Sequence, residues 1–201
     1  MAVRKLLVEG IDDLHVVKSL CMAYNIPQVF DVIDKKGISN LKESLPIELK
    51  TSDLASLGIL VDADIDLNAR WQSVRDILTK DGYTVSALPE PNGTILHAED
   101  KPKVGIWLMP DNQLPGLLEH FVAELIPDDD ALWPHAQNCV TNIPEQRFPE
   151  VARAKANIHT WLAWQEEPGK PMGTAITARY LDPGSARAQG FVDWLRALFV
   201  D

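Results

Sequence analysis

The sequence predicts an α/β protein with a mainly parallel sheet of about four strands, flanked by helices and followed by a helical extension. Two observations predict this class. Short apolar runs with β-branched residues alternate, over the first 126 residues, with segments whose apolar residues recur at helical spacing. Gly, Pro, Asn or Asp residues stand at most of the junctions. Alternating strands and helices need crossover connections, which favour parallel strands and right-handed crossovers.

Strands are expected over residues 4–8, 29–33, 57–61 and 103–109, and helices over 12–25, 39–49, 67–80 and 114–126. Asp12 is the expected N-cap of the first helix, and Trp71 lies on the apolar face of the third, so it is expected in the core. Apolar and polar residues alternate in the segments 83–88 and 93–97, and two prolines and an Asn-Gly pair lie where the segments meet. This pattern predicts a β-hairpin or edge pair before the last strand.

Residues 127–201 change character, so we expect a helical extension packed on an α/β domain of residues 1–126. Helices are expected over 131–140, 148–165, 175–180 and 188–200, after a charged turn at residues 127–130 that caps the first of them. The aromatic residues of this part are Trp161, Trp164, Trp194 and Phe199. They are expected to dock the helices on the sheet, and base stacking is the alternative.

Composition limits the function. The chain has 201 residues, 46% of them hydrophobic, which suits one domain with an appendage. Cys21 and Cys139 lie far apart without metal-ligand spacing and are expected to pack as small apolar residues in a reducing compartment. No segment resembles a signal sequence or a membrane span, so we expect a soluble, cytoplasmic protein. The sequence predicts no particular oligomeric state. A net charge of -10 argues against a broad basic surface, so binding of nucleic acid would need a bound metal and a local patch.

Carboxylates follow the third expected strand abruptly. Asp62 and Asp64 are two residues apart, so in an extended backbone their side chains project to the same side. Two anions this close repel each other, and a divalent cation is the usual remedy. A simple turn is the alternative for this pair, whereas Asp66 is expected to cap the following helix.

Acidic residues also follow other strands. Glu9 comes directly after the first strand, Asp111 after the fourth, and Glu119 lies in the next helix. Because parallel strands end at one edge of a sheet, these carboxylates are expected to converge there with Asp62 and Asp64. For Glu9, a solvated position in a loop is the alternative. Oxygen ligands without a His/Cys set favour Mg²⁺, with Mn²⁺ as the second choice.

The segments Leu-Val-Glu-Gly at 7–10 and Val-Asp-Ala-Asp-Ile-Asp at 61–66 resemble the Toprim domain, over residues 1–126. The resemblance implies a Toprim/Rossmann-like fold in which Glu9, Asp62 and Asp64 bind Mg²⁺ and Glu9 serves as acid and base. With residues 108–112 and 158–165 included, the chain is similar to small stand-alone Toprim-related proteins of unknown function.

The chain also resembles the nuclease part of the overcoming-lysogenization-defect family. That resemblance implies further metal ligands at Asp13 and Glu119 and a catalytic lysine at Lys155. The family has a serine four residues before this lysine, whereas this chain has Val151 there. A Gly-x-x-x-x-Gly-Lys nucleotide-binding motif is absent from the sequence, so we expect no ATPase module beside this part.

Two functions are expected from these features. The first is a Mg²⁺-dependent phosphoryl-transfer protein, a nuclease acting on nucleic acid phosphodiesters or nucleotides, because carboxylate-held Mg²⁺ can activate water and neutralise a leaving oxygen. The alternative is a non-catalytic Toprim-like module that binds a protein partner or a nucleotide.

Overall fold

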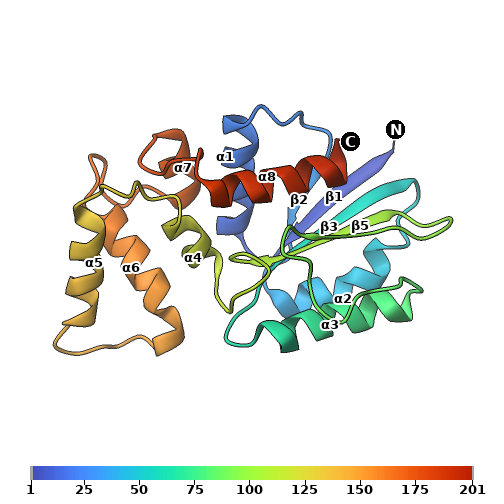
Figure 1. Cartoon of the computed structure of the whole chain (residues 1–201), viewed down its shortest axis with the longest axis horizontal. Helices are drawn as coiled ribbons and strands as arrows, with labels where there is room; N and C mark the ends of the chain where they lie inside the picture. The colour runs from blue at the N-terminus through green and yellow to red at the C-terminus, as the bar shows by residue number, and fades with distance from the viewer. Residues whose placement is uncertain (1, 201) are drawn as a thin grey trace.

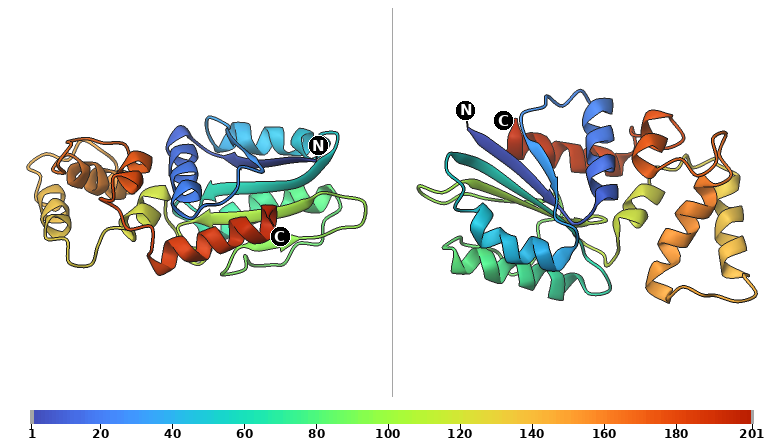
Figure 2. Two further views of the ribbon diagram at one scale, coloured as in Figure 1. Left: turned by 90° about the horizontal axis from the view of Figure 1, so that it is seen from above. Right: turned by 180° about the vertical axis from the view of Figure 1, so that it is seen from behind.

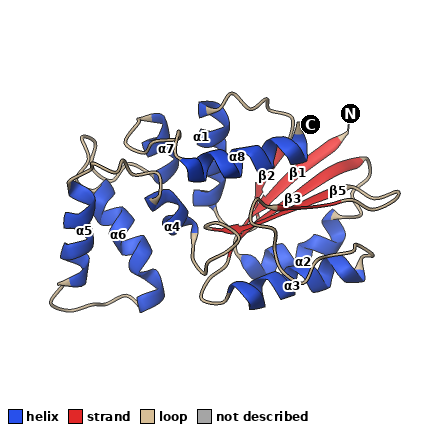
Figure 3. Cartoon of the chain, viewed as in Figure 1, coloured by secondary structure: helices blue, strands red, loops and turns tan. Residues whose placement is uncertain are grey.

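The computed structural model describes residues 2–200 and has a five-stranded sheet with helices on both faces (Figure 3). The strand order is β2-β1-β3-β5-β4. Four strands are parallel to one another: β1 (Val3–Val8), β2 (Asp31–Asp34), β3 (Leu54–Asp62) and β5 (Lys103–Met109). The short β4 (Thr94–Leu96) runs antiparallel along β5. The predicted α/β class with a mainly parallel sheet is confirmed.

Alternating side chains of the central strands build two cores, one on each face of the sheet. On one face, Leu6 and Val8 of β1 pack with residues of α1 (Ile11–Ala23) and α8 (Ala186–Phe199). On the other face, Leu7 packs with residues of α2 (Ile38–Glu48) and α3 (Leu67–Lys80). Figure 1 shows these two layers of helices on either side of the strands. The strands are therefore buried on both faces, as parallel strands in α/β proteins usually are.

The C-terminal helix α8 lies close to the sheet because two glycines face it. A Cβ atom built on Gly105 would lie 2.4 Å from a methyl carbon of Leu198, and one on Gly58 would lie 2.9 Å from the ring of Phe199. Only a residue without a side chain allows this approach. One buried cluster contains residues of both 1–126 and 127–201. The division into an α/β domain and a helical extension at residue 126 stays a prediction.

The other helices lie at one end of the molecule, beyond the sheet (Figure 2, yellow-green to orange-red). They are α4 (Leu118–Ala123), α5 (Leu132–Thr141), the short 3₁₀ helix η1 (Glu150–Ala152), α6 (Arg153–Leu162) and α7 (Met172–Thr177). Asp130 links two of them. Its Oδ1 accepts hydrogen bonds from the backbone N–H groups of Leu132 and Trp133, both at 2.8 Å, and from the indole of Trp161 at 3.1 Å. The predicted capping turn before α5 is confirmed.

One predicted element is absent and another is much shorter than predicted. Residues 83–88 form no strand; instead, the backbone carbonyl of Ser86 accepts a hydrogen bond from the indole of the buried Trp71. The helix predicted over 114–126 shortens to α4, because the backbone before it is extended. There Gly116 pairs with Asp64, whose N–H donates to the Gly116 carbonyl at 2.9 Å.

Three predictions for single residues are also wrong. Asp12 does not cap α1, which begins after Gly10. Trp164 is 38% exposed and packs against the ring of His135 at the surface, with 5.3 Å between ring centroids, whereas Trp161, Trp194 and Phe199 are buried as predicted. Cys139 is exposed.

Across residues 2–200, no helix combines the length and the apolar character that crossing a membrane requires.

Candidate carboxylate site

Glu9 and Asp62 meet where the two central strands end. β1 and β3 are parallel neighbours with Val8 opposite Leu60, and Glu9 follows β1 directly while Asp62 is the last residue of β3. A carboxylate oxygen of Glu9 accepts a hydrogen bond from the backbone N–H of Asp62 at 2.9 Å. The carboxyl edge of the sheet is the usual position for sites in open α/β folds.

Two helices bring further carboxylates to this edge. Asp13, in the first turn of α1, is 6% exposed, and its Oδ2 accepts a hydrogen bond from the N–H of Gly10 at 3.0 Å. Glu119, in the first turn of α4, is also 6% exposed. Asp62 is tied to the same helix, because its Oδ1 accepts a hydrogen bond from the N–H of Leu118 at 2.8 Å.

The four carboxylates line one cavity of 320 Å³, which we call the carboxylate cavity. Its walls include Glu9, Asp13, Asp62 and Glu119, together with Lys155 from α6. These residues lie up to 146 positions apart in the chain, from Glu9 to Lys155. The structure therefore brings together five of the six residues that were predicted as metal ligands or catalytic groups.

Burial and mutual repulsion change the acidity of this group. Burial is the largest cause that raises the pKa of Asp62, to about 9, followed by the charges of Asp13, Glu9 and Glu119. Burial, followed by the charge of Glu9, raises the pKa of Asp13 to about 7. Burial also raises the pKa of Glu9. Without a cation the group therefore holds protons near neutral pH, because ionised carboxylates at this density repel one another.

Lys155 forms an ion pair with Glu119 at the carboxylate cavity. Its Nζ lies 3.6 Å from a carboxylate oxygen of Glu119, and its side chain is 54% exposed. The lysine thus stands at the mouth of the carboxylate cavity and not among the buried carboxylates. An exposed amine at this position can contact a ligand that enters from solvent.

Asp64 lies apart from the other carboxylates. The assumption of an extended backbone from Asp62 to Asp64 was wrong, because β3 ends at Asp62 and Asp64 has a left-handed φ of 55°. The carboxylate of Asp64 forms an ion pair with Arg70 of α3. It lines a neighbouring cavity and not the carboxylate cavity. Its role as a ligand stays a prediction.

Asp111 also lies outside the group, contrary to the expected convergence of acidic strand ends. It is buried, its Oδ2 pairs with Arg187 at 3.2 Å, and its Oδ1 accepts two backbone hydrogen bonds of the following turn. These partners satisfy its charge. Asp66, by contrast, caps α3 as predicted, with its side chain accepting from the N–H of Ala69 at 2.9 Å.

Comparison with protein families gives one match, which spans almost the whole chain. Residues 3–200 match the model of the family described as "Protein of unknown function (DUF3226)". The chain belongs to the DUF3226 family. No curated protein and no solved structure matches this DUF3226 chain significantly.

The carboxylates of this DUF3226 chain are held by backbone hydrogen bonds. Within residues 2–200, no set of three or more His, Cys, Asp or Glu side chains is already arranged to hold a metal ion. The hydrogen bonds explain this, because Glu9, Asp13 and Asp62 each direct an oxygen at a backbone N–H.

The donor set nevertheless fits a hard divalent cation. Asp13 Oδ1 is a buried oxygen without any hydrogen-bond partner, and its second oxygen is already bonded to Gly10. Buried carboxylate oxygens are rarely left unpartnered without a reason. The residues that would hold Mg²⁺ in this DUF3226 chain are Glu9, Asp13, Asp62 and Glu119, all of them oxygen donors.

The sequence analysis missed two features of the site. The first is Arg70, which neutralises the charge of Asp64. Arg70 lies in the first turn of α3, four residues after the cap Asp66, and this spacing could have indicated that its charge faces the loop before the helix. The second is the start of α4, where the N–H of Leu118 holds Asp62. No local pattern indicates this contact, since the two residues lie 56 positions apart.

Proposed function

We propose that this DUF3226 protein is a Mg²⁺-dependent phosphoryl-transfer enzyme, a nuclease that cleaves phosphodiesters at a Toprim-like carboxylate site. One observation carries the proposal. Four carboxylates from four segments of the chain, two of them buried, line one cavity at the carboxyl edge of the sheet, and Asp13 has an oxygen without a partner. Uncompensated carboxylates in a concave site are a usual sign of function.

The residues have distinct roles in this proposal. Asp13, Asp62 and Glu119 hold the cation, and Glu9, whose pKa is raised by burial, also accepts a proton from the attacking water or returns one to the leaving oxygen. When bound, Mg²⁺ supplies positive charge that stabilises the charge developing on the phosphate and the leaving oxygen.

Lys155 has a different role, because it is exposed at the mouth. Its ammonium group binds a non-bridging oxygen of the phosphate and so orients the substrate over the carboxylates.

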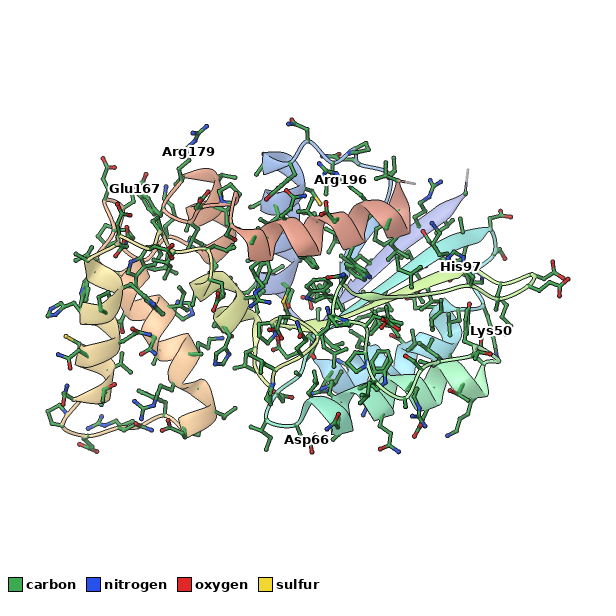
Figure 4. The ribbon with its side chains drawn as sticks, viewed as in Figure 1. Lys50, Asp66, His97, Glu167, Arg179 and Arg196 are labelled. Atoms are coloured by element: carbon green, nitrogen blue, oxygen red, sulfur yellow. The ribbon has the colours of Figure 1, made fainter. Side chains whose placement is uncertain are left out.

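The experiment is an assay of Mg²⁺-dependent hydrolysis of single-stranded DNA, duplex DNA and RNA. We expect the wild-type protein to cleave at least one of them and Asp62→Asn to be inactive. The matched control is Asp66→Asn. Asp66 lies in the loop between β3 and α3 (Figure 4), caps α3 and does not line the carboxylate cavity. Equal rates for the wild-type protein and Asp62→Asn would refute the proposal.

A second candidate function is a non-catalytic Toprim-like module that binds a protein partner or a nucleotide. The observation that favours it is the set of backbone hydrogen bonds to Glu9, Asp13 and Asp62, because carboxylates that are held and partly protonated can be structural. The absence of Mg²⁺ binding in calorimetry, together with a partner that persists in pull-downs, would support this candidate over the nuclease.

A further inference from the structure

A second, larger cavity borders the carboxylate cavity. It has a volume of 630 Å³ and lies between the loop after β3, helix α4 and the helices α5 and α6. We call it the α4–α6 cleft. Glu119 lines both cavities, and α6 contributes Asn157 to the cleft and Lys155 to the carboxylate cavity. A volume between about 300 and 1,000 Å³ is typical of sites for small molecules. A ligand part in the cleft would therefore be adjacent to the carboxylates.

The far wall of the cleft offers an aromatic ring and amide groups. Trp133 of α5 is partly exposed there, and Gln137 lies one turn further along the same helix. Asn157 of α6 also lines the cleft, and its Oδ1 is buried without a hydrogen-bond partner. A flat heterocycle can stack on an indole, and amide side chains can bond to the edge of a base.

Exposed apolar side chains stand on both sides of the opening. Ile65, in the loop after β3, is 80% exposed, and Val151 of η1 is 47% exposed. Large apolar side chains at this level of exposure beside a cavity are typical of a binding site. They suit contact with the faces of a planar ring.

The charge of the cleft selects the part of a nucleotide that can enter. Its walls carry the carboxylates of Asp64, Glu119, Glu124 and Glu150, against one arginine, Arg153, which Glu150 binds at 2.8 Å. Phosphates are repelled from such walls, whereas an uncharged base is not. Lys155 lines the other cavity, where its ammonium group lies 3.6 Å from a carboxylate oxygen of Glu119. Base and phosphate are thus directed to different cavities.

We propose that the α4–α6 cleft binds one unpaired base of the substrate, while the adjacent phosphate reaches the carboxylate cavity past Glu119. This inference rests on the proposed nuclease function and names its substrate class, a single strand or a short oligonucleotide. A base within a duplex is stacked and paired, and it cannot enter a cleft without the cost of unpairing. The acidic balance of the chain agrees with a short substrate, because a long polyanion needs many cationic contacts.

Calorimetric titration with an oligothymidylate of four residues tests this inference, both in EDTA and in Ca²⁺. We expect Trp133→Leu to weaken binding by about tenfold, since stacking on one aromatic side chain contributes roughly this much. The matched control is Trp164→Leu, which removes an exposed tryptophan outside the cleft and should leave the affinity unchanged. A blunt duplex should bind more weakly than the tetranucleotide.

Five outcomes test the proposed base site separately from the proposed nuclease function. Three results would overturn the proposal that the cleft binds a base. They are equal affinities of the wild-type protein and Trp133→Leu, a preference for the duplex, and no binding to the wild-type protein in either buffer. Trp133-dependent binding without Mg²⁺-dependent cleavage would support the cleft and refute the nuclease. If cleavage of single strands is found, Trp133→Leu should raise KM with little change in kcat, and an unchanged KM would contradict the cleft.

Discussion

A side-chain oxygen of Glu9 accepts a hydrogen bond from the backbone N–H of Asp62, 53 residues further along the chain, at 2.9 Å. This contact joins the ends of the two central strands. It also sets the distance between two carboxylates that repel each other, so their charge state responds to pH and to cations. The first predictions follow from this arrangement.

Without a metal, the protein should become less stable as the pH rises. The folded state raises the pKa of Asp62 from 3.8 to about 9, so its contribution to stability is fully present below pH 4 and is lost as the pH rises towards 9. Asp62→Asn removes the ionisable group and keeps the acceptor oxygen for Leu118. At pH 8 in EDTA, we expect it to increase the free energy of unfolding by about 1–3 kcal/mol relative to wild type.

Urea unfolding at pH 5 and pH 8 measures this effect. The difference between Asp62→Asn and the wild-type protein should be larger at pH 8. The same difference at both pH values would show that Asp62 does not titrate in this range.

Arg70 should oppose the binding of a cation. It pairs with Asp64, and its charge also lowers the pKa of Glu9. Arg70→Gln removes a positive charge next to the carboxylates and releases Asp64, so we expect Mg²⁺ to bind about three- to tenfold more tightly. Calorimetry measures the affinity. Arg75→Gln on the same helix is the control, and a weaker affinity for Arg70→Gln than for this control would contradict the prediction.

Lys155 should affect turnover more than metal binding. We expect Lys155→Gln to lower kcat by about 100- to 1,000-fold, the range seen when one charge-stabilising donor is removed. Mg²⁺ affinity should stay equal or increase, because a cation 3.6 Å from Glu119 has been removed. Steady-state kinetics and calorimetry separate the two effects, and Lys170→Gln, outside the cavity, serves as the control. Unchanged kcat would exclude a role in turnover.

The packing of α8 on the sheet should depend on Gly105. A Cβ at this position would lie 2.4 Å from a side-chain carbon of Leu198, so Gly105→Ala must displace the Leu198 side chain or the helix that carries it. We expect a loss of about 1–3 kcal/mol in the free energy of unfolding, as is usual for overpacking. Gly190→Ala on α8 is the control, because nothing lies within 4 Å of its added Cβ, and it should stabilise the helix by roughly 0.5–1 kcal/mol. Equal stabilities of the two variants would contradict this packing.

The strands of the fold could be predicted from sequence because they are buried on both faces and read as apolar runs. Residues 103–109 were predicted with the bounds that the structure gives. The structure of segment 83–88 could not be predicted. Its apolar and polar residues alternate as in a strand, but the backbone carbonyl of Ser86 accepts a hydrogen bond from the indole of Trp71. An interaction between a side chain and a distant backbone leaves no trace in local periodicity.

The candidate site divides in the same way. Glu9 and Asp62 could be placed together because parallel strands end at one edge, which depends only on topology. Lys155 came from a family resemblance, whereas Glu119 was also expected from its place after the fourth strand. Their meeting at 3.6 Å depends on how α4 packs against α6. Asp64 was misplaced relative to Asp62 because a single left-handed residue, which sequence does not reveal, turns the backbone.

A crystal soaked in Mn²⁺ tests the central proposal most directly. Anomalous scattering should reveal an ion bound by oxygens of Asp13 and Asp62, with Glu9 and Glu119 around it, and the ion should be missing from crystals of Asp62→Asn. Carboxylates that keep their hydrogen bonds to Gly10, Asp62 and Leu118, with no anomalous signal between them, would contradict the account.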